Sequence, residues 1–171
     1  MKNILKIITA ITILTLLPLK SISAESLKLR YISSTYSDNK GAGLKFPEGV
    51  ACNEKNIVIV ADTGNYRLVQ YTLQDGTLKG GDEIKVTELS YPVNVQLNSK
   101  GEIFALDGKQ RRIVRLGAEG AFKGYIDPQG LLSPSNFVPR SFKIDNADNM
   151  YVLDIAAGRV FVLDPEGKFL R

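Results

Sequence analysis

The sequence contains no histidine and no tryptophan, and it has a single cysteine, Cys52, among 171 residues. Without an imidazole, the chain lacks the usual base that activates a serine or cysteine nucleophile, and it lacks the common nitrogen ligand of zinc. One cysteine excludes an internal disulfide and a thiolate cluster, so packing must stabilise the fold. These absences predict no catalytic residue and no cofactor.

The longest apolar run lies at the N-terminus and spans only residues 7–17. Lys2 and Lys6 precede this run, Pro18 follows it, and the small residues Ser23 and Ala24 come next. The run is shorter than the roughly 20 residues that cross a bilayer as a helix. We therefore interpret residues 1–24 as a cleaved signal peptide rather than an uncleaved anchor, and we expect a periplasmic or extracellular protein with no membrane attachment after cleavage.

The basic excess of the chain comes mostly from this leader. Lys2, Lys6 and Lys20 are among the 22 basic residues, so 19 remain after cleavage against 18 acidic residues. A near-neutral mature chain argues against nucleic acid as a partner, although a local basic cluster remains. We interpret this cluster as a solvated face rather than a binding patch for nucleic acid. It consists of Lys109, Arg111, Arg112 and Arg115.

Three segments of the remaining chain repeat the same landmarks. A proline opens each copy at intervals of 45 and 47 residues, and the same intervals separate an aspartate and, five residues later, an arginine. The positions are Pro47, Pro92 and Pro139, then Asp62, Asp107 and Asp154, then Arg67, Arg112 and Arg159. Shared spacing at three landmarks indicates an internal repeat.

Within each copy, apolar residues alternate or form short blocks bounded by Asn, Asp and Gly, which is typical of strands. We expect second strands at 57–61, 103–106 and 150–153, third strands at 68–71, 113–116 and 160–163, and a fourth strand of the first copy at 83–89. A four-stranded antiparallel unit recurring every 40 to 50 residues is typical of a β-propeller blade. The predicted fold is therefore all-β, with three four-stranded blades.

The first strand of each copy follows its proline, since proline can open a strand. In the alignment of the copies, Val50 corresponds to Val95 and Phe142, and Cys52 corresponds to Leu97 and Ile144. All of these positions are expected to point inward. We therefore expect Cys52 to be a core residue and not a nucleophile.

The repeated aspartate and arginine flank the loop between the second and third strands. There an aspartate can accept hydrogen bonds from free backbone N–H groups, and an arginine five residues later can return to it. Because the pair occurs in all three copies, we interpret it as structural rather than as part of a site.

The first copy resembles the NHL repeat in Pro47, Gly49-Val50-Ala51, Ala61-Asp62 and Arg67-Leu68, and the lead-in from Tyr31 to Pro47 resembles the link between NHL blades. The resemblance implies a propeller of about six blades. Three are present here, at 46–90, 91–137 and 138–171, the last incomplete, and residues 25–45 are expected to supply an outer closing strand and a lead-in loop. Either the chain is part of a longer protein, or two copies form a homodimer that completes one six-bladed ring.

Two functions follow from the resemblance. The leading prediction is a non-enzymatic, secreted scaffold or sensor that binds a protein or glycan through Glu48, Arg140, Lys109, Arg111 and Arg112. The alternative is a gluconolactonase-like hydrolase that holds a divalent metal with Glu48 and Asn94, since oxygen ligands suit calcium. The repeat register argues against this metal site, because Val93 and Arg140 align with Glu48, and Gly49 aligns with Asn94.

Overall fold

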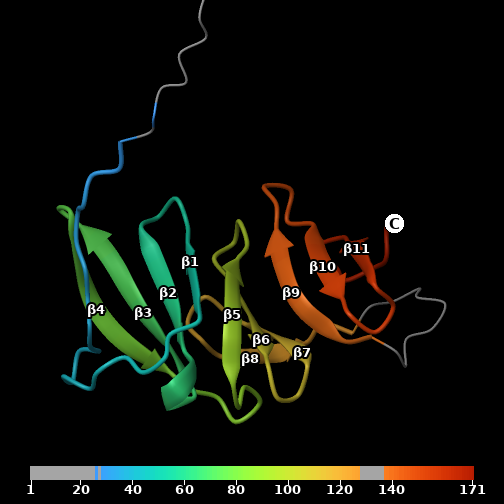
Figure 1. The fold of residues 1–171 in the computed structure, drawn as a ribbon, viewed down its shortest axis with the longest axis horizontal. Helices are drawn as coiled ribbons and strands as arrows, with labels where there is room; N and C mark the ends of the chain where they lie inside the picture. Colours follow the sequence, from blue (N-terminus) through green and yellow to red (C-terminus); the bar gives the residue numbers. More distant parts are fainter. Residues whose placement is uncertain (1–25, 27, 128–136) are drawn as a thin grey trace, which may run out of the picture. The chain divides into compact units, whose positions relative to one another are not determined.

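The computed structural model describes residues 26, 28–127 and 137–171, so the interpreted signal peptide lies outside the described residues. Contacts divide the chain between Tyr31 and Ile32, and the fold described below belongs to residues 32–171. In this part the described residues form three antiparallel sheets that lie side by side (Figure 1).

Each sheet corresponds to one copy of the repeat, with the strands in sequence order across the sheet. Blade one contains β1 (Gly49–Cys52), β2 (Ile57–Asp62), β3 (Arg67–Gln74) and β4 (Thr77–Ile84). Blade two contains β5 (Pro92–Leu97), β6 (Ile103–Asp107), β7 (Arg112–Leu116) and β8 (Phe122–Tyr125). Blade three contains β9 (Pro139–Ile144), β10 (Met150–Asp154) and β11 (Arg159–Leu163). The predicted all-β blade architecture is confirmed, and a single 3-10 turn, η1 (Thr63–Asn65), interrupts it among the described residues.

The second and third strands were predicted to within a few residues, but the prediction of the fourth strand of blade one at 83–89 was wrong. Asp75 and Gly76 have positive φ angles of 50° and 71° and form a two-residue turn. This turn pairs Gln74 with Thr77, so β4 starts directly after it. Glu83 and Ile84 belong to β4, whereas residues 85–89 lie in the connection to blade two.

Blade three has three strands and the beginning of a fourth. Leu163 forms an isolated antiparallel bridge with Phe169, and Leu170 donates its backbone N–H to Val162 O.

Apolar side chains fill the two spaces between neighbouring blades. We call the face of each blade that points toward the preceding blade its leading face, and the opposite face its trailing face. The first cluster joins Ile59, Ala61 and Leu68 on the trailing face of blade one to Val95, Ile103, Ala105, Val114 and Leu116 on the leading face of blade two. The second joins Phe104, Leu106 and Ile113 of blade two to Phe142, Met150, Val152, Phe161 and Leu163 of blade three. The core is therefore a pair of equivalent interfaces between sheets.

The prediction that Val50 and Cys52 lie in the core was wrong. The Val50 side chain is 64% exposed, whereas its counterparts Val95 and Phe142 are 0% and 2% exposed, and Cys52 is also exposed. The alignment assigned both residues to the correct face of the strand. That face is the leading face of blade one, and no described blade packs on it.

The described residues between Ile32 and Pro47 form no strand beyond an isolated bridge between Ser37 and Gly43. This lead-in packs on blade one, since Tyr71 donates its hydroxyl hydrogen to Ser37 O at 2.9 Å and Arg67 contacts Asp38. The outer closing strand expected within residues 25–45 stays a prediction.

Candidate functional site

One rim of the blades collects the residues that the sequence singled out. Because β1 pairs antiparallel with β2, with Gly49 opposite Ala61, the start of each innermost strand lies beside the end of the second strand. The connections 63–66, 108–111 and 155–158 therefore lie at the same end as Glu48, Pro92 and Pro139. We call this end the lower rim, and it is at the bottom of Figure 1.

A fully buried aspartate fixes the backbone of the lower rim in every blade. Asp107 accepts hydrogen bonds from the backbone N–H groups of Ser90, Tyr91, Lys109 and Gln110, and from the Ser90 hydroxyl. Burial alone would raise the pKa of Asp107, but these hydrogen bonds outweigh it and hold the pKa below its ordinary value. Asp62 and Asp154 occupy equivalent positions, accepting from the backbone of Lys45 and of Val138 and Ala156, respectively.

The repeated arginine contacts this aspartate in blades one and three but not in blade two. Arg67 Nε lies 2.8 Å from Asp62 Oδ2, and Arg159 Nε lies 3.4 Å from Asp154 Oδ2. In blade two, Arg112 instead stacks over the Tyr125 ring at 3.5 Å and contacts the exposed Asp127. The predicted pairing is wrong there because backbone and Ser90 donors already occupy the carboxylate of Asp107.

Lys109 links the lower rims of blades one and two. Its Nζ lies 5.2 Å from the ring centroids of both Tyr66 and Tyr91, and the two rings are 6.0 Å apart. Tyr66 has a positive φ of 59°, which presents its half-exposed ring at the rim. An ammonium held between two tyrosine rings is a cation–π arrangement. Sequence reasoning found Lys109 but missed both tyrosines, which are conspicuous only once the loops are placed together.

The other predicted binding residues are distributed along the same rim. Glu48 is exposed directly before β1, and Arg140 is exposed as the second residue of β9. Arg111 is also exposed and, with a positive φ of 54°, ends the turn after Asp107. The structure therefore places these residues at one end of the sheets, where Lys109 contacts the Tyr66 side chain of the neighbouring blade.

The Asn94 side chain forms hydrogen bonds with residues of the innermost strands. Its Nδ2 donates to Ser141 Oγ at 3.3 Å, across blades two and three, and its Oδ1 accepts from Gln96 at 3.4 Å. Among the described residues, no group of three or more His, Cys, Asp or Glu side chains is placed to hold a metal ion. The alternative metal site at Glu48 and Asn94 thus receives no support from the geometry.

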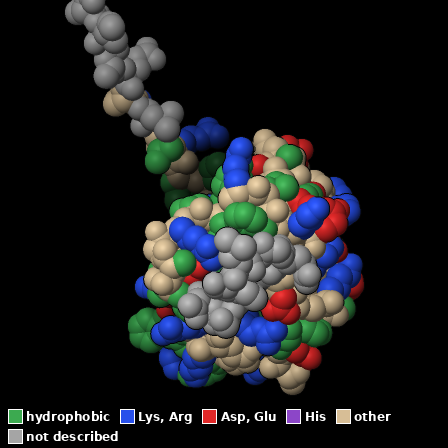
Figure 2. Space-filling view, turned by 90° about the vertical axis from the view of Figure 1, so that its right-hand side faces the viewer, with side chains coloured by type: hydrophobic (Ala, Val, Ile, Leu, Met, Phe, Trp, Pro, Cys, Tyr) green, Lys and Arg blue, Asp and Glu red, His purple; other side chains and the backbone are tan. Residues whose placement is uncertain are grey.

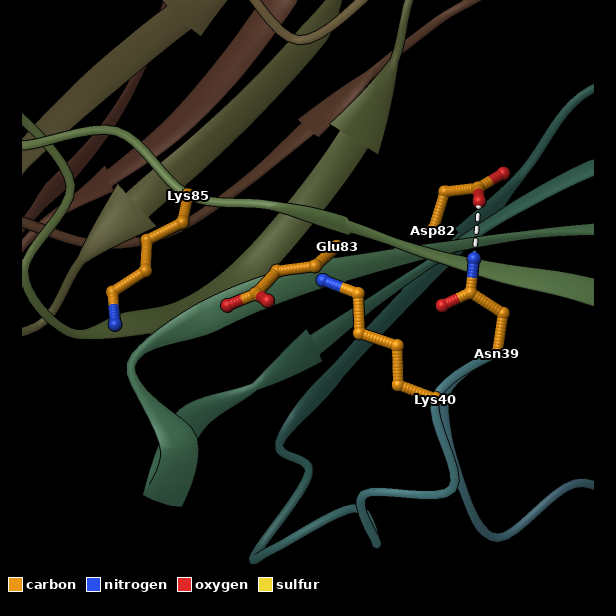
Figure 3. Close-up of a pocket in the computed structure, with 5 residues that line it drawn as sticks. All are labelled: Asn39, Lys40, Asp82, Glu83 and Lys85. Carbon is orange, nitrogen blue, oxygen red and sulfur yellow. Dashed lines mark hydrogen bonds between the residues drawn. The ribbon is translucent and has the colours of Figure 1, made fainter.

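A depression on blade one lies against β4, whose last residues pair with the start of β3 next to the lower rim. It encloses about 450 Å³ and is lined by Asn39, Lys40, Asp82, Glu83 and Lys85. Figure 3 shows the Lys40 and Lys85 side chains on either side of Glu83, and Asn39 donating to Asp82 at 2.7 Å. Two lysines and two carboxylates line it in an open, solvated setting, so this depression has the character of an ordinary charged surface. In the described part of the chain, no helix has the length and apolar character to cross a membrane.

Solved structures with the same arrangement of sheets are β-propellers. A streptogramin B lyase is 19% identical, with 72% of this chain and 39% of that chain covered and a TM-score of 0.54. A chain of a nidogen–laminin complex is 20% identical, with coverage of 73% and 46% and a TM-score of 0.57. A gluconolactonase from Xanthomonas campestris is 17% identical, with coverage of 66% and 36% and a TM-score of 0.53. This chain thus spans less than half the length of each, and identities this low show the fold alone.

The three sheets are blades of a β-propeller. More narrowly, residues 44–71, in the first blade, match the family model of the NHL repeat. No curated protein matches the chain. The predicted resemblance to NHL propellers is therefore confirmed, and function has to be argued from the site.

Proposed function

We propose that the chain is a non-enzymatic, exported binding module that contacts an acidic protein partner through its lower rim. The observation that carries the proposal is Lys109, whose Nζ lies 5.2 Å from both the Tyr66 and Tyr91 rings. Residues of two blades thereby form one continuous surface, beside the exposed Arg111.

The chemistry of this surface suits a protein contact. Tyrosine and arginine are enriched at the centres of protein interfaces, because they combine apolar area with hydrogen bonding and few rotatable bonds. Exposed guanidinium and ammonium groups favour carboxylates in the partner.

The composition supports a non-enzymatic role. The 171 residues include no histidine, so no serine or cysteine of this chain has an imidazole base. The calcium-dependent hydrolase alternative would require Glu48 and Asn94 to share an ion, whereas the Asn94 amide bonds Ser141 and Gln96. Calorimetric titration with calcium tests that alternative directly, and a saturable heat would revive it.

The binding proposal is tested with an immobilised array of acidic and basic peptides of matched length. The unmodified chain is expected to bind acidic peptides, and the double variant Lys109→Glu/Arg111→Glu to lose at least about tenfold in affinity. The matched control is Lys55→Glu/Lys100→Glu, which makes the same charge change in exposed turns at the opposite end of the sheets. Equal loss in both double variants, or a preference for basic peptides, would contradict the proposal. Tight, strongly salt-dependent binding to RNA would replace it.

A further inference from the structure

A cavity opens between blades one and two at the end of the sheets opposite the lower rim. We call this end, which carries the turns after β1, β5 and β7, the upper rim, and it is at the top of Figure 1. The cavity encloses about 200 Å³. Its walls are mostly apolar side chains of the two facing blades, namely Ile57 and Ile59 of blade one and Leu97, Ile103 and Ala118 of blade two. The cavity belongs to an interface whose two sides are both present in this chain.

The equivalent space between blades two and three is filled. It encloses only about 10 Å³. Phe104 and Met150 line it at the repeat positions that Ile59 and Ile103 have in the first space. The phenyl ring is larger than the Ile59 side chain, so a sequence difference opens the first space. Protein interiors leave few such voids, because unfilled space costs stability, and a retained cavity is therefore a candidate binding site.

Two lysines at the same repeat position line the cavity. Lys55 and Lys100 are 45 residues apart and exposed, and each is the third residue of a turn that begins with an asparagine. Asn53 Oδ1 accepts the backbone N–H of Lys55 at 3.0 Å, and Asn98 Oδ1 accepts that of Lys100 at 3.1 Å, so the two turns are built alike. Among the described residues, neither ammonium group has an ion-pair partner.

The charge that lines the cavity is of one sign. The exposed Glu54 and Glu119 lie on the same turns but outside the lining. The space between blades two and three is lined instead by Asp148 and Asp164. On the face shown in Figure 2, Lys and Arg side chains are interspersed with Asp and Glu. The cavity thus combines apolar walls with positive charge, which favours an apolar ligand that carries an anionic group.

A half-buried amide in the cavity is available to such a ligand. Gln70 of β3 lines the wall, and within the part of the chain that the structure describes its side chain makes no hydrogen bond. The residue at this position in blade two, Arg115, donates to Glu102 at 2.7 Å. Polar groups shielded from water are normally hydrogen-bonded, so the Gln70 amide adds a donor beside the two lysines.

We propose that this cavity binds a small aliphatic carboxylate, with the alkyl chain against Ile57 and Leu97 and the carboxylate near Lys55 and Lys100. The size agrees, since about 200 Å³ holds roughly seven groups of the volume of a water molecule. A chain of about six carbons with its carboxylate fits this space. The site is separate from the lower rim and does not rest on the function proposed for that rim.

An NMR titration of the full chain with hexanoate, butanoate, hexanol and hexylammonium tests each part of the proposal. Hexanoate is expected to bind saturably at one site, and butanoate about tenfold more weakly because it buries two methylenes fewer. Hexanol is expected to bind about fivefold more weakly than hexanoate, since it lacks the charge, and hexylammonium not to saturate. Absence of saturable hexanoate binding, or equal affinity for hexanoate and hexylammonium, would overturn the proposal.

A charge reversal locates the site. Lys55→Glu/Lys100→Glu is expected to weaken hexanoate binding at least about tenfold and to leave hexanol binding within about twofold, because the apolar walls are unchanged. The matched control is Lys109→Glu/Arg111→Glu, which makes the same charge change at the lower rim and should keep hexanoate affinity within about twofold. Loss of hexanoate binding in the lower-rim variant alone would overturn the proposal. Acidic peptides without an apolar tail provide a separate readout, so failure of either proposal is recognised independently of the other.

A substitution that fills the cavity tests the apolar walls. Ile59→Phe introduces the residue type that blade two has at the same repeat position, and it is expected to weaken hexanoate and hexanol alike by at least about tenfold. A cooperative thermal transition shows that this variant is folded. If it is folded and binds hexanoate with unchanged affinity, the cavity is not the site. If it does not fold, the lysine variants and the ligand series decide the question.

Discussion

The guanidinium of Arg67 lies between two carboxylates, with Nη1 2.6 Å from Asp38 Oδ2 and Nε 2.8 Å from Asp62 Oδ2. All three side chains are 6% exposed or less. Burial alone would raise the pKa of Asp38, but hydrogen bonds from Arg67 and from the backbone N–H groups of Ala42 and Lys40 outweigh it and lower the pKa. The arginine thus attaches the lead-in to blade one.

Replacing Arg67 is expected to be far more damaging than replacing its repeat counterpart. Arg67→Met leaves two buried carboxylates without their cation, and we expect a loss of about 3 to 5 kcal/mol in the free energy of unfolding. The matched control is Arg112→Met, whose side chain is 42% exposed and contacts Asp127, which is 73% exposed. That change is expected to cost about 1 kcal/mol or less. Denaturant unfolding of both variants measures the difference, and similar losses would contradict the buried role of Arg67.

Asp107 is expected to contribute to stability and not to ligand recognition. Asp107→Ala removes the acceptor of backbone N–H groups from Ser90, Tyr91, Lys109 and Gln110, and leaving them unpaired costs about 3 kcal/mol or more. Thermal unfolding should show the loss, while affinity for the acidic peptides, measured well below the melting temperature, should stay within about twofold. Unchanged stability with lost affinity would reverse this assignment. Asp127→Ala, at an exposed aspartate of the same blade, is the control.

The sequence was sufficient to predict the blades, because strand periodicity and repeated landmarks are local signals. Alignment also assigned Val50 to the correct face of its strand. It could not predict exposure, since Val50 and Val95 have the same pattern and differ only in whether a neighbouring blade packs on them. Burial in a repeat protein depends on a neighbour as well as on the repeat itself.

Contacts between distant segments were the other part that the sequence could not supply. The pairing of Arg67 with Asp38 joins residues 29 positions apart, and the placement of Lys109 between Tyr66 and Tyr91 depends on how two blades pack. No spacing rule connects such residues. Arg112 departs from the repeat for the same reason: its guanidinium stacks on Tyr125 of β8, while the Asp107 carboxylate already accepts hydrogen bonds from Ser90 and from the backbone.

Glu102 is expected to make stability fall in acid. Burial alone would raise its pKa, but hydrogen bonds from Arg115, Lys123 and Asn98 outweigh it and lower the pKa from 4.5 to about 2. A carboxylate with a lowered pKa in the folded state stabilises the protein above pH 4.5, and this contribution is lost as the pH falls toward 2. With solvent screening at the half-exposed Lys123, the loss amounts to about 2 kcal/mol.

The pH profile of two variants isolates this contribution. Between about pH 5 and pH 2.5, the free energy of unfolding of Glu102→Gln should fall less steeply than that of the unmodified chain. Glu119→Gln, at an exposed glutamate, should retain the full slope. The same slope in all three proteins would show that Glu102 titrates alike in the folded and unfolded states.

Gly49 is expected to be required by the spacing between blades one and two. A Cβ at this position would lie 3.0 Å from Asn94 Cα, 3.1 Å from Val93 O and 3.2 Å from Val95 N, all backbone atoms of β5. Backbone cannot yield as a flexible side chain does, so Gly49→Ala should force the innermost strands apart and destabilise the protein by about 1 to 3 kcal/mol. At Gly43 the nearest atom, Tyr36 O, is 3.8 Å away, so Gly43→Ala should change stability by less than about 1 kcal/mol. Denaturant midpoints of the two variants test this, and equal midpoints would mean that the two strands separate freely.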